Sequence, residues 1–144
     1  MSVIADALKG SPVLVTGASG FIGGHLAERL ATREGARVVG GGRSFKADAE
    51  KTLRDAGVEL ARADLTDAAA MERLCEGKSI VFHLAAWLMR GKGGDASAYA
   101  VNVDATRTLV QAASRAGVKR FVLASSVASY GLPPVDDVDE NVPI

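Results

Sequence analysis

Residues 12–23 read Pro-Val-Leu-Val-Thr-Gly-Ala-Ser-Gly-Phe-Ile-Gly, and this segment is the most informative one about the fold. A β-branched run over residues 12–16 ends in a glycine loop, and residues 20–33 then repeat apolar side chains one helical turn apart. Gly17 permits a sharp turn off the strand, Gly20 a close approach of main chain to a diphosphate, and Gly23 close packing of helix on strand. The free N–H groups and the positive dipole end of the helix attract phosphate. The stretch therefore predicts a strand, a diphosphate-binding loop and a helix.

The same alternation continues along the chain. Four more apolar runs are typical of parallel strands covered on both faces, at residues 37–41, 58–62, 79–83 and 120–124. Helical patterns lie between them, at residues 47–56, 68–75 and 96–116, and the last carries an apolar stripe of Val103, Thr106, Leu109, Val110 and Ala113. Glycines suited to helix C-caps follow the helices at positions 35, 57, 77 and 117. This order predicts an α/β fold with an open, doubly wound parallel sheet and strand order 3-2-1-4-5.

Composition narrows the class of protein. The chain has 144 residues, 48% of them apolar, with 17 basic and 17 acidic side chains, which excludes a disordered chain. The zero net charge gives no electrostatic reason to expect nucleic acid or a membrane surface as a partner. The single cysteine, Cys75, excludes an internal disulfide and favours a reducing compartment. Because no signal peptide or long apolar segment is visible, we expect a cytoplasmic protein.

We expect one domain over residues 1–131, followed by an acidic, proline-rich C-terminal loop over residues 132–144. A fifth strand followed only by such a loop would lie at a sheet edge with its outer hydrogen-bonding groups uncovered. We therefore expect these residues to be the first part of a longer protein. The bare strand and the helix over residues 96–116 are candidate surfaces for a homo-oligomer.

The end of the second strand bears on cofactor choice. An Asp or Glu at this place would bond the 2′-hydroxyl of a ribose, but residues 39–44 read Val-Gly-Gly-Gly-Arg-Ser. Arg43 offers a planar fork to a phosphate, with Ser44 and Lys46 as further donors. This pattern predicts NADP rather than NAD. The alternative is that Arg43 stacks on adenine or faces solvent.

Five segments in order resemble the extended short-chain dehydrogenase/reductases, the NAD-dependent epimerase/dehydratase family. The first, residues 16–26, reads Thr-Gly-Ala-Ser-Gly-Phe-Ile-Gly-Gly-His-Leu and resembles the nucleotide loop of that family. The others are Ala-Asp-Leu-Thr-Asp at 63–67, Val-Phe-His-Leu-Ala-Ala at 81–86, the helix from Asn102 to Ala113, and residues 118–131, which end in Ser-Ser-Val-Ala-Ser-Tyr-Gly. The resemblance spans residues 12–143 and implies a Rossmann-type, NAD(P)-binding sheet, truncated after its fifth strand.

The resemblance also implies site residues. Asp64 would contact adenine, and the small residues after the fourth strand would lie beside the cofactor ribose. The full set of implied cofactor-binding residues is Gly17, Ala18, Ser19, Gly20, Phe21, Ile22, Gly23, Arg43, Ser44, Asp64, Leu65, Leu84, Ala85 and Ala86. Ser126 would be the catalytic serine, with Ser125 its neighbour and Asn102 supporting the active site. Without the resemblance, a loop serine more commonly caps local backbone.

The resemblance implies an oxidoreductase or epimerase that transfers a hydride at a secondary alcohol or ketone, with a substrate that the sequence does not identify. The family depends on a Tyr-x-x-x-Lys pair, and neither Tyr99 nor Tyr130 has a lysine four residues later. We therefore expect little turnover from these 144 residues alone. The alternative is a non-catalytic NADP-binding module that senses redox state or serves interaction. A Tyr-x-x-x-Lys encoded downstream would favour the enzyme.

Three further residues receive structural interpretations. We expect His83 to be a hydrogen-bonded structural side chain and Cys75 a small buried one. Trp87, followed by Leu88 and Met89, could border an apolar substrate, but such side chains more often cover core. Two distant histidines and one cysteine give no metal-ligand spacing, so we expect no metal.

Overall fold

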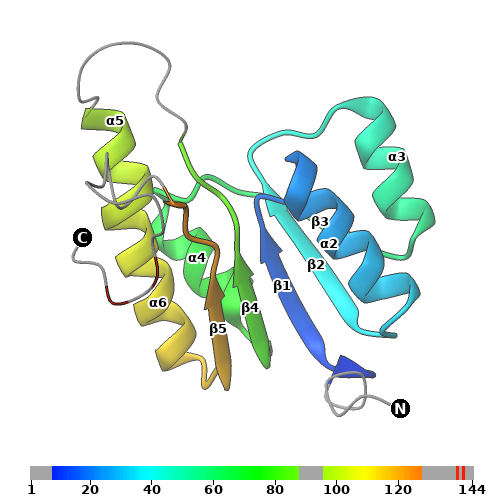
Figure 1. The fold of residues 1–144 in the computed structure, drawn as a ribbon. Helices are drawn as coiled ribbons and strands as arrows, with labels where there is room; N and C mark the ends of the chain where they lie inside the picture. The colour runs from blue at the N-terminus through cyan, green and yellow to red at the C-terminus, as the bar shows by residue number, and fades with distance from the viewer. Residues whose placement is uncertain (1–7, 88–95, 128–138, 140, 142–144) are drawn as a thin grey trace.

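A computed structural model describes residues 8–87, 96–127, 139 and 141 (Figure 1). Five parallel strands form one sheet in the order β3-β2-β1-β4-β5, as predicted. Their bounds are β1 (Pro12–Thr16), β2 (Arg37–Gly42), β3 (Glu59–Arg62), β4 (Ile80–His83) and β5 (Arg120–Leu123). In this register Thr16 lies opposite both Gly41 and His83, so the carboxyl ends of the three central strands meet at one edge.

Helices cover both faces of the sheet (Figure 1). One face carries α2 (Phe21–Thr32) and α3 (Ala47–Asp55); the other carries α4 (Ala68–Cys75), α5 (Ala96–Tyr99), the π-helical η1 (Ala100–Ala105) and α6 (Thr106–Arg115). Consecutive residues of β1 serve opposite faces: Val13 and Val15 belong to the core under α2 and α3, whereas Leu14 belongs to the core under α4 and α6. Each fully buried side chain of this size contributes about 1.5–3 kcal/mol to folding.

The predicted C-cap glycines are confirmed. Gly35, Gly57, Gly77 and Gly117 have φ values of 65°, 82°, 65° and 74°, the left-handed conformation in which a β-carbon is unfavourable. Each lies where a helix turns back toward the next strand. The positions of these glycines in the sequence therefore predicted correctly where the helices end.

The predicted helix over residues 96–116 needs a correction. Instead of one regular helix, the segment widens into a π-helical turn at η1, which shifts the phase of the residues after it. Leu109 and Ala113 are buried as predicted, but Val110 is 44% exposed and Ala112 takes its place in the core. Leu109, Ala112 and Ala113 share one face of α6 by their i, i+3, i+4 spacing, and Val110 lies beside that face.

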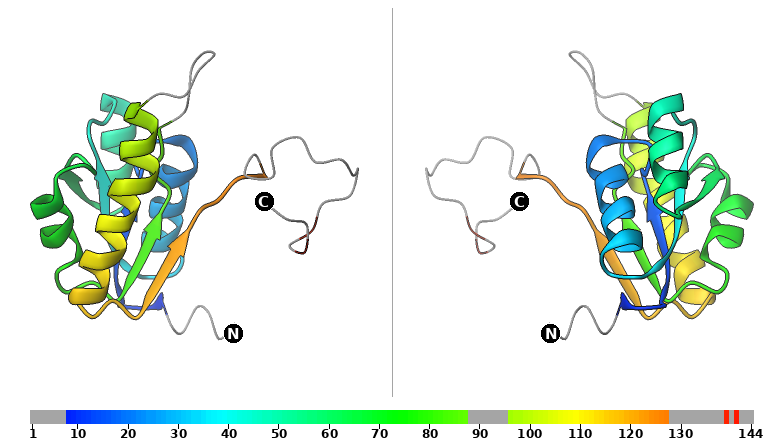
Figure 2. Two further views of the ribbon diagram at one scale, coloured as in Figure 1. Left: turned by 90° about the vertical axis from the view of Figure 1, so that its left-hand side faces the viewer. Right: turned by 90° about the vertical axis from the view of Figure 1, so that its right-hand side faces the viewer.

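Strand β5 lies at the end of the sheet, beside β4 (Figure 2). The expectation that every strand is covered on both faces is wrong here, because Leu123 is 55% exposed and Val122 is exposed as well. Of the remaining predictions, those on Leu88, Met89 and Tyr130 lie outside the described residues, as does nearly all of the expected loop over residues 132–144. Among the helices described, none is both long and apolar enough to cross a bilayer.

Candidate dinucleotide site at the carboxyl edge of the sheet

The glycine loop between β1 and α2 is shaped by main-chain contacts. Gly17 has φ +76°, and a β-carbon there would lie 2.7 Å from the amide nitrogen of Ala85. A β-carbon at Gly23 would lie 2.2 Å from the carbonyl oxygen of Gly17. The predicted close packing at Gly23 is therefore against the loop itself, directly after β1. The N–H of Ala18 donates to the carbonyl of Gly41 at 3.1 Å, which ties the loop to β2.

Helix α2 begins without a side-chain cap. Its N-cap residue is Gly20, whose N–H donates to the carbonyl of Gly17 at 2.9 Å, and no acid stands in its first turn. The first N–H groups of any α-helix have no carbonyl one turn earlier to bind. The side chains of Phe21 and Ile22 are 82% and 70% exposed, so they leave this end open. A loop with no room for a β-carbon at Gly17 or Gly23, ending in uncapped N–H groups, fits the phosphates of a dinucleotide.

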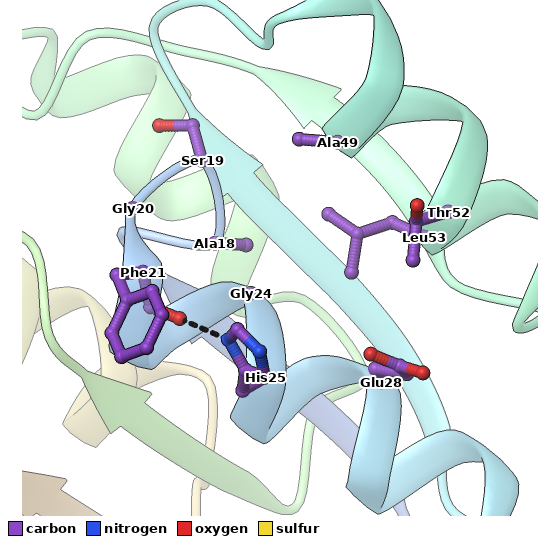
Figure 3. Close-up of a pocket in the computed structure, with 10 residues that line it drawn as sticks. All are labelled: Ala18, Ser19, Gly20, Phe21, Gly24, His25, Glu28, Ala49, Thr52 and Leu53. Atoms are coloured by element: carbon purple, nitrogen blue, oxygen red, sulfur yellow. Dashed lines mark hydrogen bonds between the residues drawn. The ribbon is translucent and has the colours of Figure 1, made fainter.

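A groove of about 350 Å³ runs between α2 and α3 beside the loop (Figure 3). Within it, His25 Nδ1–H donates to the carbonyl of Phe21 at 2.8 Å. Its lining residues are Ala18, Ser19, Gly20, Phe21, Gly24, His25, Glu28, Ala49, Thr52 and Leu53. At its loop end, Ser19 Oγ lies 2.9 Å from where a β-carbon at Gly42 would stand. The hydroxyl of Ser19 is thus beside the end of β2.

Side chains from three separate segments meet at the same edge. Arg43, directly after β2, places its guanidinium carbon 5.4 Å from the ring centroid of Trp87, which follows β4. Asn102 in η1 holds the main chain of Trp87 on both sides: its Oδ1 accepts from the Trp87 N–H at 2.7 Å, and its Nδ2 donates to the Trp87 carbonyl at 3.0 Å. Asn102 therefore fixes the main chain of the segment after β4.

Asp64 lies after β3 and is held in a local turn. Its Oδ1 accepts from the N–H of Thr66 at 2.9 Å and from the Thr66 hydroxyl at 2.7 Å. These two hydrogen bonds hold the pKa of Asp64 below its ordinary value, and the charge of Arg43 lowers it further. The carboxylate is thus ionised and within the field of Arg43, at the edge where the adenosine end of a cofactor was predicted.

His83, at the end of β4, is 1% exposed and bridges two threonines. Its Nδ1 is 2.6 Å from Thr16 Oγ1 and its Nε2 is 2.9 Å from Thr106 Oγ1. A neutral imidazole has one donor and one acceptor nitrogen, so it satisfies both hydroxyls. Burial lowers the pKa of His83 from 6.5 to about 4, which keeps it neutral. The structural interpretation of His83 is confirmed.

Two other predictions concern the opposite end of the edge. Ser125 and Ser126 are exposed just after β5, and the N–H of Ala124 donates to the carbonyl of His83 at 3.0 Å, which holds the start of that loop against β4.

Cys75 is fully buried, as expected, and burial raises the pKa of its thiol. Within the described part of the chain, no three His, Cys, Asp or Glu side chains gather as a metal site would require.

The structure thus brings the glycine loop, Arg43 and the segment after β4 together at one edge. A β-carbon at Gly17 would collide with the main chain of Ala85, so the glycine loop lies directly against the segment after β4. The sequence missed the pairing of Trp87 with Arg43, and it missed Thr16 and Thr106 as partners of His83. Only the common position of Arg43 and Trp87, both just beyond central strands, could have indicated their contact. The threonines carry no such signal.

Comparison with known proteins identifies the class. The model of the NAD dependent epimerase/dehydratase family matches residues 13–144. UDP-glucose 4-epimerase of Mycolicibacterium smegmatis is 39% identical over 91% of this chain and 44% of its own length. Sterol demethylase protein B of Methylococcus capsulatus is 37% identical over 89% of this chain and 38% of its own length. A short-chain dehydrogenase/reductase superfamily protein of Agrobacterium tumefaciens, crystallised with bound NAD, is 33% identical with a TM-score of 0.77, over 92% of this chain and 38% of that one.

These matches define a dinucleotide-binding domain of the oxidoreductase and epimerase type. The chain belongs to the NAD-dependent epimerase/dehydratase family. It spans less than half of the length of the relatives that it matches, 44% of one and 38% of another.

Proposed function

We propose that this domain binds a nicotinamide dinucleotide, with NADP preferred, in a protein that oxidises a secondary alcohol or reduces a ketone. The observation that carries binding is the cradle of Gly17, Gly20 and Gly23, together with the uncapped start of α2. Main-chain N–H groups there would hold the diphosphate. When bound, a nicotinamide dinucleotide supplies hydride-transfer chemistry.

The preference for NADP rests on the end of β2. Gly42 is followed by Arg43 and Ser44, and the hydroxyl of Ser19 lies against Gly42. A 2′-phosphate at this place would meet a guanidinium and two hydroxyls instead of a carboxylate. These donors support NADP, although the related structure from Agrobacterium tumefaciens contains NAD.

Three predicted residues would act on the substrate side. We assign Ser126, with Ser125 beside it, to hydrogen-bonding of a substrate oxygen on which charge develops, since both lie beyond the carboxyl end of β5. Asn102 would act through the Trp87 main chain that it holds. Residues 1–144 contain no Tyr-x-x-x-Lys pair, so turnover would require an acid–base pair from elsewhere in the protein.

Calorimetric titration of the protein with NADP and with NAD tests the proposal. We expect NADP to bind about tenfold tighter, because charge-assisted hydrogen bonds to the 2′-phosphate are worth about 1.5–3 kcal/mol. Arg43→Gln should remove this preference and leave the affinity for NAD within about twofold. Arg107→Gln is the matched control, since Arg107 of α6 forms an exposed ion pair with Asp104 of η1. Equal affinities in the unaltered protein would contradict the preference for NADP.

Two smaller proposals concern the setting of the protein. A cytoplasmic location is supported by the single, fully buried Cys75. Homo-oligomerisation through β5 or through the helical segment from α5 to α6 is supported by exposed apolar side chains on both: Leu123 on the strand, Tyr99 on α5 and Val110 on α6. The mass of the protein in solution would test the second proposal.

A further inference from the structure

The guanidinium of Arg43 makes an unusual contact for a phosphate-binding residue. Its partner is the face of the Trp87 indole, 5.4 Å from guanidinium carbon to ring centroid, which is within the range of a cation–π interaction. No carboxylate of residues 8–87 or 96–127 lies within 4 Å of it, whereas Arg54 and Arg62 both bind Glu50 nearby. The side chain of Arg43 is exposed and that of Trp87 is half-buried. The contact therefore joins a surface cation to a partly anchored ring.

This contact crosses the middle of the site. The order of strands is β2-β1-β4, with Arg43 one residue beyond β2 and Trp87 four residues beyond β4. The end of β1 and its glycine loop lie between them. Adjacent strands are about 4.8 Å apart, so the two side chains meet over a separation of about 10 Å between strand ends. The Arg43–Trp87 bridge thus lies across the strip through which a dinucleotide passes from the β2 side to the β4 side.

The two ends of the bridge are not equally free to move. Two hydrogen bonds from Asn102 fix the main chain of Trp87, at 2.7 Å and 3.0 Å. Arg43 has no hydrogen bond or ion pair to the described residues. When the bridge opens, the guanidinium is therefore the part that moves, back toward the end of β2.

We propose that Trp87 is a selectivity residue, which competes with the 2′-phosphate of the cofactor for the guanidinium of Arg43. This inference rests on the proposed function, since it takes Arg43 to be the 2′-phosphate ligand. A ligand with a 2′-phosphate has to draw Arg43 off the indole before it gains its strongest contact. A ligand with a 2′-hydroxyl leaves that contact in place. The indole therefore lowers the preference that Arg43 would otherwise give.

The probes are adenosine 2′,5′-bisphosphate and AMP, which differ only in the 2′-phosphate. Exposed cation–π contacts are worth about 0.5–1 kcal/mol, so Trp87→Leu should bind the bisphosphate about two- to fivefold tighter. Its affinity for AMP should stay within about twofold. Trp87→Phe keeps a weaker aromatic face and should fall between the two. Because Trp87 is the only tryptophan, its fluorescence in the unaltered protein should change with the bisphosphate and not with AMP.

Three results would overturn the inference. Weaker binding of the bisphosphate by Trp87→Leu, with Trp87→Phe unchanged, would mean that the ring holds Arg43 ready for the phosphate. Equal gains for both probes would mean that the bridge obstructs any adenine nucleotide. A gain that persists in Arg43→Gln/Trp87→Leu, relative to Arg43→Gln, would mean that Arg43 is not what Trp87 withholds.

The same titrations separate this inference from the proposed preference for NADP. If the unaltered protein prefers the bisphosphate and Trp87→Leu adds nothing, the competition is wrong and the preference for NADP stands. If the unaltered protein shows no preference and Trp87→Leu creates one, the competition is supported and NADP selectivity is wrong. If neither protein distinguishes the probes, both are wrong.

Discussion

Helices α2 and α4 begin at the same edge of the sheet, directly after β1 and β3, yet their first turns are completed in opposite ways. At α4, Asp67 is the N-cap and its side chain accepts from the N–H of Ala70 at 3.0 Å. At α2, the N-cap is Gly20 and no side chain binds the free N–H groups. An aspartate cap stabilises a helix by about 1 kcal/mol, and α2 lacks this stabilisation because its N-cap is a glycine. The capped start of α4 therefore serves the fold alone, whereas the uncapped start of α2 is able to bind an anion.

The largest effect on NADP affinity is expected when α2 is given an aspartate N-cap like that of α4. Gly20→Asp would place a carboxylate on the N–H groups that we assign to the diphosphate. At an effective dielectric constant of about 20, two like charges about 4 Å apart repel by about 4 kcal/mol, so NADP affinity should fall on the order of a thousandfold. The extended conformation of Gly20, φ −91° and ψ 171°, accepts a side chain, so the protein should remain folded and gain slightly in stability.

Gly20→Ser separates the charge from the cap. It adds the same β-carbon, 3.3 Å from the carbonyl oxygen of Gly17, and a neutral hydroxyl cap. Calorimetric titration should show a much smaller loss of affinity than for Gly20→Asp. If Gly20→Asp still binds NADP as tightly as the unaltered protein does, the diphosphate is not held at α2.

The next effect tests whether the cradle tolerates any side chain. Gly23→Ala would bring a β-carbon within 2.2 Å of the Gly17 carbonyl, and main chain there has little room to retreat. We expect a loss of about 3 kcal/mol in the free energy of unfolding, at the upper end of overpacking costs. Gly24→Ala is the matched control one residue along, where the nearest contact is 3.2 Å from the Ala18 carbonyl. Similar denaturant midpoints for the two variants would show that Gly23 is not sterically required.

Features made of main chain were predictable from the sequence. The C-cap glycines and the glycine loop follow from local rules on where a β-carbon can stand, and the strand order follows from the alternation of apolar runs with helical patterns. The π-helical turn of η1 does not follow from such rules, because its side-chain period differs from 3.6 for only a few residues. The same is true of the Arg43–Trp87 bridge, since two residues 44 positions apart meet only after the sheet has aligned its strand ends.

The third expected effect is a pH dependence of stability that arises from His83, which is buried beneath the glycine loop. The unfolded chain protonates His83 below about pH 6.5, whereas in the folded protein its pKa is about 4. The contribution of His83 to stability is therefore complete above pH 6.5 and is lost as the pH falls toward 4. The shift corresponds to at most about 3 kcal/mol.

Chemical denaturation at several pH values measures this loss. His83→Gln should be less stable near neutral pH, and its stability should depend less steeply on pH between 6.5 and 4. His25→Gln, a substitution on the exposed face of α2, is the matched control variant. A slope that survives in His83→Gln would assign the pH dependence to other groups.

The smallest expected effect is the loss of stability when the N-cap of α4 is removed. Asp67→Ala removes the side-chain hydrogen bond to the first turn of α4, so the free energy of unfolding should fall by about 1 kcal/mol. NADP affinity should stay within about twofold, because the cap of α4 is not part of the dinucleotide cradle. Asp104→Ala, which removes an acid from an exposed pair with Arg107, should change stability by less than about 0.5 kcal/mol. If Asp67→Ala weakened NADP binding as strongly as Gly20→Asp does, the two helix starts would share one function and the contrast between them would fail.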